Sequence, residues 1–368
     1  MGIKNLNKFL RDKCPEVFQE THISNFSFKK VAIDISLYMY KFKAIAGERW
    51  LSAFINLITS LRRNHMHCIF IFDGKSPPEK EEERTRRRAE RDKLEKKVND
   101  LLEAIDEYYK TGEIHEILTQ LWERRRKKPA KRLLGSNSTS IDMDWVIEKV
   151  DQKKCQIIHV TEEDFNTSKQ LFDIMSIPHF TAPWEAEKMC AKLCIDGIVD
   201  AVLSEDTDVI AYGAPVFITK IDTRDDTAVV IENNSVQTAL EFSHSQLLDL
   251  CIMCGTDYNS NIFRVGAHTA YKKLVEFENI EGVDQNTQLD ISILKHTVVR
   301  GLFTKFEDYG ISEIPYCGTP NYKELLQFIV DKKIWFDTRR GDNENISMSE
   351  SRLQKIKDDL TRNDIVFE

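Results

Sequence analysis

The chain has 368 residues, of which 41% are hydrophobic and 10% aromatic, enough for a sizeable core. The low content of Gly (14) and Pro (9) excludes a collagen-like or wholly disordered chain. The net charge of −8 argues mildly against a nucleic-acid binder, although the distribution of charge matters more than its sum. No apolar stretch approaches the ~20 residues of a membrane span, and residues 1–6 lack the apolar segment of a secretory signal, so an intracellular protein is expected.

Short apolar runs alternate with helical stretches along the chain. Strands are predicted at 31–33, 68–72, 155–160, 201–203 and 216–218. Helices are predicted between them, for example at 50–63 and 186–195. This alternation is typical of an α/β fold with a mostly parallel sheet that is covered by helices on both faces.

Acidic residues follow three of these predicted strands. Asp34 follows the first, Asp73 follows the second, and Asp206 and Asp208 follow the strand at 201–203. Sites in open α/β sheets form outside the carboxyl ends of the strands. We therefore expect these four carboxylates to converge on one edge of the sheet.

Three further acids join this group. Glu185 and Glu187 stand where a helix opens, and Asp257 follows an apolar helical stretch. One such glutamate would be explained by the helix dipole. Two of them, at i and i+2, can reach one site only if the helix is just beginning.

A cluster of seven carboxylates would repel itself unless cations compensate it. All-oxygen carboxylate sites select hard ions, Mg²⁺ first and Mn²⁺ as a substitute. Two such ions ~4 Å apart can activate a water and stabilise a leaving oxygen in phosphodiester hydrolysis.

Basic residues form two dense blocks in this otherwise acidic chain. Residues 84–97, which include Arg84 and Arg88, hold eight Lys or Arg against three acids, and residues 124–132 hold seven and no acid. The segment 79–132 predicts long helices that project from the core. A solvated helical face, or a nuclear-import signal at 124–132, is the alternative to a phosphate-binding surface. Two separate blocks favour the phosphate-binding surface.

Five ordered blocks and the N-terminal residues 1–6 (MGIKNL) resemble flap endonucleases of the XPG family of structure-specific 5′ nucleases. The blocks lie at 34–40, 72–78 (FDGKSPP), 182–187 (APWEAE), 205–208 (EDTD) and 250–258, so that together they span about 1–275. The resemblance implies a PIN-like nuclease core with a helical arch. It also implies Mg²⁺-dependent cleavage of DNA near the junction of a duplex and a 5′ single strand, in replication, repair or recombination.

The resemblance assigns roles to individual residues. The metal-site carboxylates would be Asp34, Asp73, Glu185, Glu187, Asp206, Asp208 and Asp257, of which Asp34 and Asp73 are also counted as catalytic. Lys80 and Arg87 match the pair that contacts the scissile phosphate, and their i, i+7 spacing places both on one helix face.

Other matched positions concern DNA binding. Tyr40 matches an aromatic residue on which a base stacks, with core packing as the alternative. Gly2 matches a glycine packed near the site, and Arg84 and Arg88 are expected to contact DNA with Lys80 and Arg87.

Residues 262–274 resemble the helix–two-turn–helix with which the family holds duplex DNA through backbone amides and a K⁺ ion. Gly266 is kept, but Arg264 and Ala267 stand where the family usually has Gly and Pro. Arg264 could supply a phosphate contact instead, and the K⁺ site is in question. No clamp-binding motif occurs near the C-terminus, so recruitment by a sliding clamp is unsupported.

The expected organisation has four parts: an N-terminal half of the nuclease core at 1–98, an enlarged basic arch at 99–154, the second half of the core with the helix–two-turn–helix at 155–275, and a C-terminal helical region at 276–368. A monomer is expected, in the nucleus or, for a viral protein, the host nucleus, with the cytoplasm as an alternative. No membrane association is expected.

Other functions stay open at this point. A 5′ exonuclease or a single-strand nuclease belongs to the same class. A DNA-binding scaffold without catalysis predicts missing acids, and none is missing. An aspartyl phosphatase using Asp206 and Asp208 would leave Asp34, Asp73 and the basic helix unexplained.

Removal of residues 124–132 is expected to weaken DNA binding and to flatten its dependence on salt, because the arch would lose phosphate contacts. The measurement is the dissociation constant for a 5′-flap DNA over a range of KCl concentrations. Since the arch is expected to contact the single-stranded 5′ end, the slope of log K against log salt should change by ~0.7 for each lost contact. An unchanged slope would show that this block does not touch the DNA.

Overall fold

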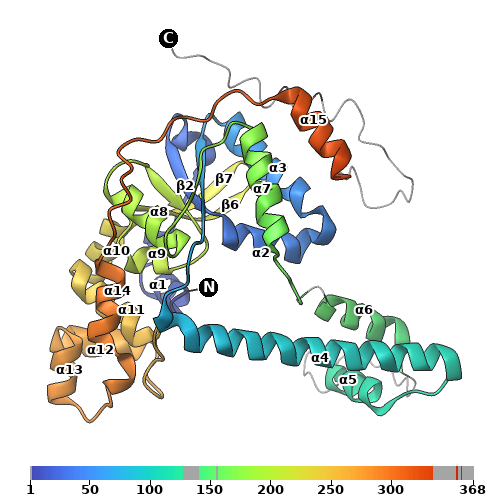
Figure 1. The fold of residues 1–368 in the computed structure, drawn as a ribbon. Helices are drawn as coiled ribbons and strands as arrows, with labels where there is room; N and C mark the ends of the chain where they lie inside the picture. Colours follow the sequence, from blue (N-terminus) through green and yellow to red (C-terminus); the bar gives the residue numbers. More distant parts are fainter. Residues whose placement is uncertain (1, 127–140, 155, 335–353, 355–357, 359–368) are drawn as a thin grey trace.

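A seven-stranded sheet forms the centre of the computed structural model, which describes residues 2–126, 141–154, 156–334, 354 and 358 (Figure 1). The strands are β1 (Gln19–His22), β2 (Lys30–Asp34), β3 (His67–Phe72), β4 (His179–Thr181), β5 (Ala201–Leu203), β6 (Val216–Asp222) and β7 (Thr227–Glu232). Their order across the sheet is β1-β7-β6-β5-β2-β3-β4. The strands from β6 to β4 pair in parallel, and β7 pairs antiparallel with β6 and β1. The expected mostly parallel sheet is confirmed.

Helices cover both faces of this sheet (Figure 1). One face carries α1 (Leu6–Lys13), α8 (Ala186–Ile195), α10 (Asn233–Leu240), α11 (His244–Cys254), α12 (Ala267–Phe277), α13 (Ile280–Asn286) and α14 (His296–Thr304). The other carries α2 (Ile35–Ala46), α3 (Trp50–Arg63), α7 (Glu162–Ile174) and α15 (Tyr322–Asp331). The short helix α9 (Asp208–Ala211) follows β5.

Each strand in the middle of the sheet contributes to two hydrophobic cores. Along β2, Ala32 packs into one core and Val31 and Ile33 into the other. Because successive side chains of a strand point to opposite faces, a strand buried on both faces must be apolar at every position. This is why β2 and β3 were readable as continuous apolar runs.

The chain changes direction across the sheet between β5 and β2. From β2 it builds outward through β3 to β4, and after returning it builds from β5 through β6 in the other direction. In doubly wound sheets, ligands bind at the carboxyl ends of the strands where the order reverses. The topology therefore locates a site outside β5 and β2.

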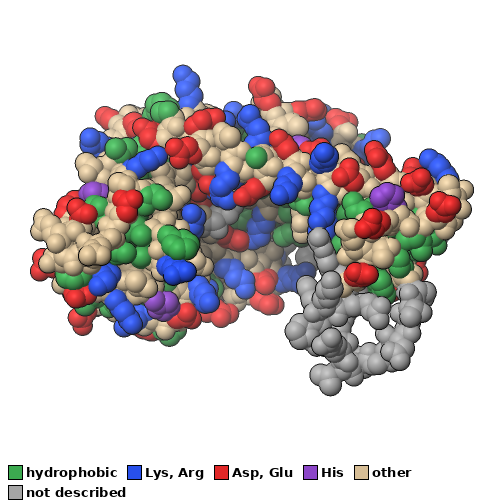
Figure 2. Space-filling model, turned by 90° about the horizontal axis from the view of Figure 1, so that it is seen from below, with side chains coloured by type: hydrophobic (Ala, Val, Ile, Leu, Met, Phe, Trp, Pro, Cys, Tyr) green, Lys and Arg blue, Asp and Glu red, His purple; other side chains and the backbone are tan. Residues whose placement is uncertain are grey.

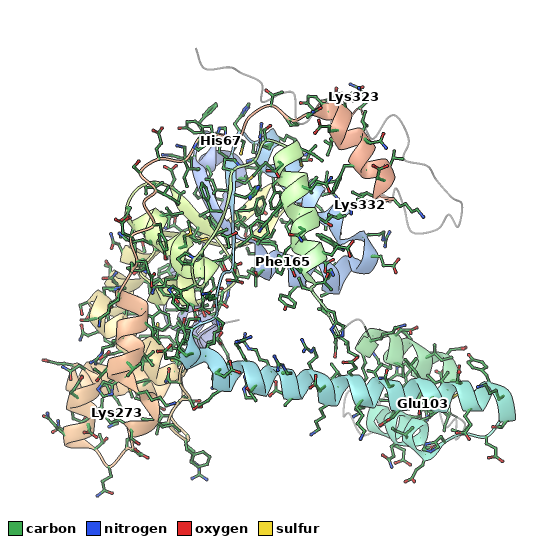
Figure 3. All side chains as sticks on the ribbon, in the orientation of Figure 1. His67, Glu103, Phe165, Lys273, Lys323 and Lys332 are labelled. Carbon is green, nitrogen blue, oxygen red and sulfur yellow. The ribbon has the colours of Figure 1, made fainter. Side chains whose placement is uncertain are left out.

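The helix α4 (Glu81–Thr111) leaves this edge and projects from the body of the molecule (Figure 1). Its outer part, where Glu103 lies far from the sheet (Figure 3), packs against α5 (Glu116–Arg126) and α6 (Met143–Lys154) through a small core of its own. The long projecting helices expected at 79–132 are confirmed as far as residue 126, and residues 127–132 lie outside the described part. The expected boundary at 98/99 falls inside α4, so the arch and the core share one continuous helix.

The strand predicted at 155–160 is wrong. Residues 156–160 form no strand; the amides of Gln156 and Ile157 instead donate to Lys153 O and Lys154 O, 3.0 and 2.9 Å away, as the chain turns out of α6. Thr161 then caps α7 in a reciprocal pair of hydrogen bonds with Asp164. The apolar side chains of Ile157, Ile158 and Val160 are only partly buried as the chain passes from α6 to α7. The outer neighbour of β3 is instead the short β4, which follows Pro178.

The C-terminal helices are tied to the core by charge as well as by apolar contact. Arg300 of α14 bonds the buried Asp249 of α11, with Nε–Oδ1 at 2.6 Å, and also Glu281 of α13. One guanidinium thus joins three helices. None of the described helices combines the length and apolar composition that crossing a bilayer requires.

Candidate metal centre

Carboxylates leave three neighbouring strands at one edge of the sheet. Asp34 is the last residue of β2, Asp73 follows β3 directly, and Asp206 and Asp208 follow β5. Since β5, β2 and β3 are adjacent and parallel, their carboxyl ends meet. The predicted convergence of these acids is borne out by the geometry.

Backbone amides fix the orientation of these carboxylates. Asp34 accepts from the Ser36 amide at 2.8 Å, Asp73 accepts from the Ala186 amide at 2.8 Å, and Asp206 accepts from the Asp208 amide at 3.0 Å. The first two bonds are helix caps, for α2 and α8, so the helix starts hold the acids in place. Each acid is anchored through one oxygen at the sheet edge.

The tightest group consists of Glu187, Asp206 and Asp208. One carboxylate oxygen from each lies within 4.8 Å of the others. Asp208 Oδ1 is buried and has no hydrogen-bond partner among the described residues. A buried oxygen without a donor is costly, and a hard cation would satisfy it. The all-oxygen donor set thus fits a divalent ion such as Mg²⁺.

Burial works against the charge of this group. It raises the pKa of Glu187 and Asp208 well above the ordinary value, and the nearby Asp206 carboxylate adds to the effect in both. Burial likewise raises the pKa of Asp34, with Asp73 as the next cause. The acids therefore require a proton or a cation to share the site.

Glu185 and Asp257 complete the cluster from two other elements. Glu185 is the residue before α8, so the helix is just beginning there, as its spacing from Glu187 demanded. Asp257 sits in a tight turn in which Thr256 Oγ1 donates to Asn259 Oδ1 at 2.7 Å and accepts from the Tyr258 amide at 3.0 Å. This turn presents Asp257 to the site.

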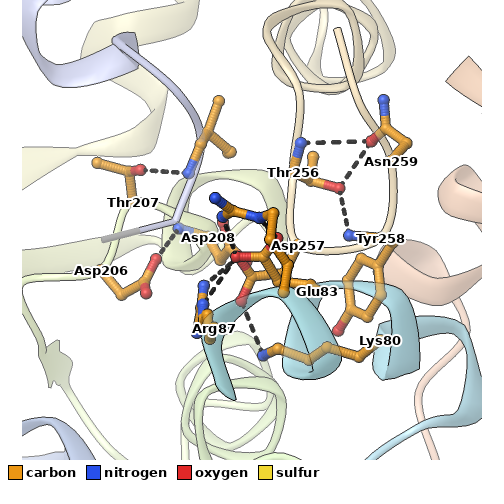
Figure 4. A network of polar contacts seen from close by, with 12 residues as sticks. Lys80, Glu83, Arg87, Asp206, Thr207, Asp208, Thr256, Asp257, Tyr258 and Asn259 are labelled. Carbon is orange, nitrogen blue, oxygen red and sulfur yellow. Dashed lines mark hydrogen bonds and ion pairs between the residues drawn. The ribbon is translucent and has the colours of Figure 1, made fainter. Parts of the chain in front are cut away.

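Two cations reach the acids from the base of α4 (Figure 4). Lys80 Nζ lies 3.0 Å from Asp257 Oδ2 and also bonds Glu185, and Arg87 Nη2 lies 2.6 Å from Asp257 Oδ1. Burial lowers the pKa of Lys80, but Glu185 and Asp257 outweigh burial and raise it above the ordinary value. Lys80 and Arg87 thus face one point, as their i, i+7 spacing predicted.

The N-terminal residues lie between the loop that carries Asp206 and Asp208 and the turn that carries Asp257. The Ile3 amide donates to Thr207 Oγ1 and the Lys4 amide to Gly255 O, both at 3.0 Å. Gly2 has a φ of +78°, and a Cβ at this position would lie 1.9 Å from Asp206 Oδ1. Only glycine fits so close to the acids with this backbone.

Comparison with known proteins identifies the family to which this chain belongs. Residues 1–94 match the XPG N-terminal domain and residues 176–257 match the XPG I-region. The chain is 33% identical over 329 residues to a probable RAD2-like endonuclease of Invertebrate iridescent virus 3, covering 82% of this chain and 85% of the relative. It is 26% identical to flap endonuclease 1 of Cryptosporidium parvum, covering 92% of this chain and 68% of the relative. The chain belongs to the XPG family.

Solved structures of other proteins share the fold. The flap endonuclease-1 of Methanococcus jannaschii aligns with a TM-score of 0.57 at 22% identity, over 95% of this chain and 97% of that one. The catalytic core of Rad2 in complex with DNA substrate aligns with a TM-score of 0.62 at 18% identity, over 91% and 96%. The PIN-like nuclease fold is therefore confirmed. As an XPG-family member, the chain is an endonuclease that hydrolyses phosphodiester bonds.

The remaining predicted positions of this XPG-family nuclease lie outside the acidic cluster. Tyr40 on α2 is 44% exposed, so the core-packing alternative is wrong for it. Arg84 and Arg88 are exposed on α4. Arg264 lies in the loop between α11 and α12 with a φ of +62°, and Gly266 precedes the first residue of α12.

Tyr258 is a site residue that sequence reasoning missed. Its hydroxyl donates to the Glu185 carboxylate and lies 3.0 Å from the hydroxyl of Tyr212. Its ring faces Lys80 (Figure 4), whose Nζ lies 5.9 Å from the ring centre. Its position directly after Asp257 was the only signal, because its partners come from distant segments.

Gly2→Ala is expected to lower the cleavage rate roughly 10- to 100-fold, because the new Cβ must displace the Asp206 carboxylate by a large fraction of an ångström or more. The measurement is a single-turnover cleavage rate at saturating Mg²⁺. Gly47→Ala is the matched control: Gly47 also has a positive φ, +56°, but a Cβ there meets nothing within 4 Å. Equal rates for the two variants would contradict the proposed contact.

Proposed function

We propose that this endonuclease is a Mg²⁺-dependent, structure-specific 5′ nuclease that cuts DNA near the junction of a duplex and a 5′ single strand. The observation that carries the proposal is the buried acidic cluster with the unpartnered Asp208 Oδ1, faced by Lys80 and Arg87. Metal-dependent phosphodiester hydrolysis requires carboxylates that bind the metal ions and basic side chains that bind the phosphate, and this site combines the two.

The acids would hold two Mg²⁺ ions, and Mn²⁺ would substitute for them. Bound ions lower the pKa of a water and stabilise charge on the leaving oxygen. The proposed ligands, directly or through water, are Asp34, Asp73, Glu185, Glu187, Asp206, Asp208 and Asp257. Backbone amides hold Asp34, Asp73 and Asp206 in place before any ion binds.

Lys80 and Arg87 would bind the scissile phosphate. Both are held at the site by Asp257, which is the only carboxylate that contacts the two of them in the described part of the chain. A phosphate at this point would share the two cations with Asp257 and orient the reacting bond. Because Lys80 and Arg87 lie at the base of α4, a substrate that moved the arch would also move these two phosphate-binding side chains.

The DNA would follow the basic surface next to the site. In Figure 2, Lys and Arg side chains surround the hollowed middle of the face seen from below. Arg84 and Arg88 would contact the strand along α4, and Tyr40 would stack a base. The α11–α12 loop with Arg264 and Gly266 would hold the duplex; a K⁺ ion there stays a prediction.

Cleavage of a labelled 5′-flap duplex tests the function. The wild type should cut at the junction in Mg²⁺ or Mn²⁺ and not in EDTA, and Asp206→Ala should lower the rate by several orders of magnitude while flap binding persists. Stepwise release of mononucleotides from the 5′ end would instead favour the 5′ exonuclease. Binding without any cut in either metal would refute the proposal.

Arg87→Ala is expected to reduce the single-turnover rate roughly 10²- to 10³-fold, as loss of one donor to a reacting oxyanion typically does. Arg91→Ala is the matched control, because Arg91 lies about one turn further along the same helix and its carboxylate partner, Asp92, is exposed and 3.9 Å away. Its rate should stay within about twofold of the wild type, since exposed pairs of this kind contribute little. Equal losses in both variants would mean that only the general charge of α4 matters.

A further inference from the structure

A pocket of 330 Å³ opens directly beside the metal centre. Glu185 and Tyr258, which belong to the acidic site, form one wall. Its other apolar lining residues are Trp184, Pro77, Pro78 and Leu302. The pocket thus combines the segment before α4, the segment before α8 and one face of α14.

Trp184 is the unusual member of this lining. Trp184 is 36% exposed, although Ala182 and Ala186, two residues before and after it, are buried. The backbone is fixed, since Trp184 O accepts from the Gly74 amide at 2.7 Å. The backbone that carries this large ring is therefore anchored, and the ring lines the pocket.

The polar groups of the pocket select what can enter it. Glu79 and Glu307 add two carboxylates to Glu185, and Lys188 is neutralised by Glu307 at 3.0 Å. A phosphate would be repelled by these acids. The amino groups of a nucleobase would instead find hydrogen-bond acceptors, and its face would find an aromatic ring.

The pocket is also open at its far end. A second pocket of 120 Å³ shares Tyr258 and Leu302 with it and continues to Val298 and Lys295. Lys295 Nζ lies 3.3 Å from the largely exposed Glu82 of α4. The two pockets form a groove that runs from the metal centre between the start of α4 and α14.

We propose that this pocket binds one nucleobase of the strand being cut, next to the scissile phosphate, with Trp184 as the ring on which the base stacks. The proposal rests on the proposed function, because it takes DNA as the substrate. It adds a recognition element directly beside Glu185. Burying one base there would help to hold the phosphate over the acids.

The test pairs protein variants with abasic substrates. Trp184→Ala and Trp184→Phe are compared with the wild type on flap DNA that carries an abasic nucleotide on either side of the scissile phosphate. One abasic position should lower kcat/KM of the wild type roughly 5- to 150-fold, the usual range for loss of one stacked base. Trp184→Ala should show the same loss on intact DNA and no further loss on that abasic DNA, and Trp184→Phe should recover most of the activity.

Tyr316→Ala is the control for removal of an exposed aromatic ring, since Tyr316 is 56% exposed and packs against His67, the first residue of β3, at the edge of the sheet away from the acids. Its kcat/KM should equal that of the wild type on every substrate. Thermal unfolding of all variants separates a folding defect from a binding defect, and Trp184→Phe keeps the test valid if Trp184→Ala is unstable.

Two results would overturn the proposal. In the first, Trp184→Ala retains wild-type kcat/KM on intact DNA, which leaves the proposed function standing and removes the pocket from it. In the second, the losses from Trp184→Ala and from the abasic nucleotide multiply, which means that the ring and the base do not meet and that the pocket serves another partner. Failure of the proposed function is distinct, since the wild type would then cut no flap DNA.

Discussion

Carboxylates that repel one another are packed together at a buried edge of the sheet, and the groups around them must compensate for this repulsion. Burial and close acidic neighbours both disfavour the charged form of Glu187 and Asp208. The fold offsets this cost locally, with backbone amides on Asp34, Asp73 and Asp206 and with cations on Asp257. Among the described residues, no donor satisfies the buried Asp208 Oδ1, so a bound cation is needed to compensate its charge.

The helix α4 couples this centre to the outer part of the molecule. Its base supplies Lys80 and Arg87, and its far end carries a separate small core with α5 and α6. Because one helix without a break joins the two, a displacement of the outer part would also act on the groups that face Asp257. Tyr258, bonded to Glu185 and beside Lys80, ties the same region to the core.

Features that depend on local order in the chain could be predicted, and features that depend on distant partners could not. The acids at the ends of β2, β3 and β5 follow apolar runs, and α3 and α8 have the predicted bounds. The run at 155–160 was misleading because its apolar residues at 157, 158 and 160 are only partly buried and form no strand, while the short β4 has no apolar run that would predict it. Tyr258 and the pocket around Trp184 depend on contacts between segments far apart in the chain, which no local pattern encodes.

Crystals grown with Mn²⁺ would test the central claim most directly, through the anomalous scattering of the ion. A peak about 2.0–2.6 Å from carboxylate oxygens of Asp208, with Asp206 or Glu187 as a second ligand, is the expected result, since hard divalent ions take oxygen ligands at such distances. The peak should disappear in Asp208→Asn crystals. If saturating Mn²⁺ gives no peak at this edge of the wild-type protein, the carboxylates are not a cation site, and the cluster must be neutralised by protons and by Lys80 and Arg87 alone.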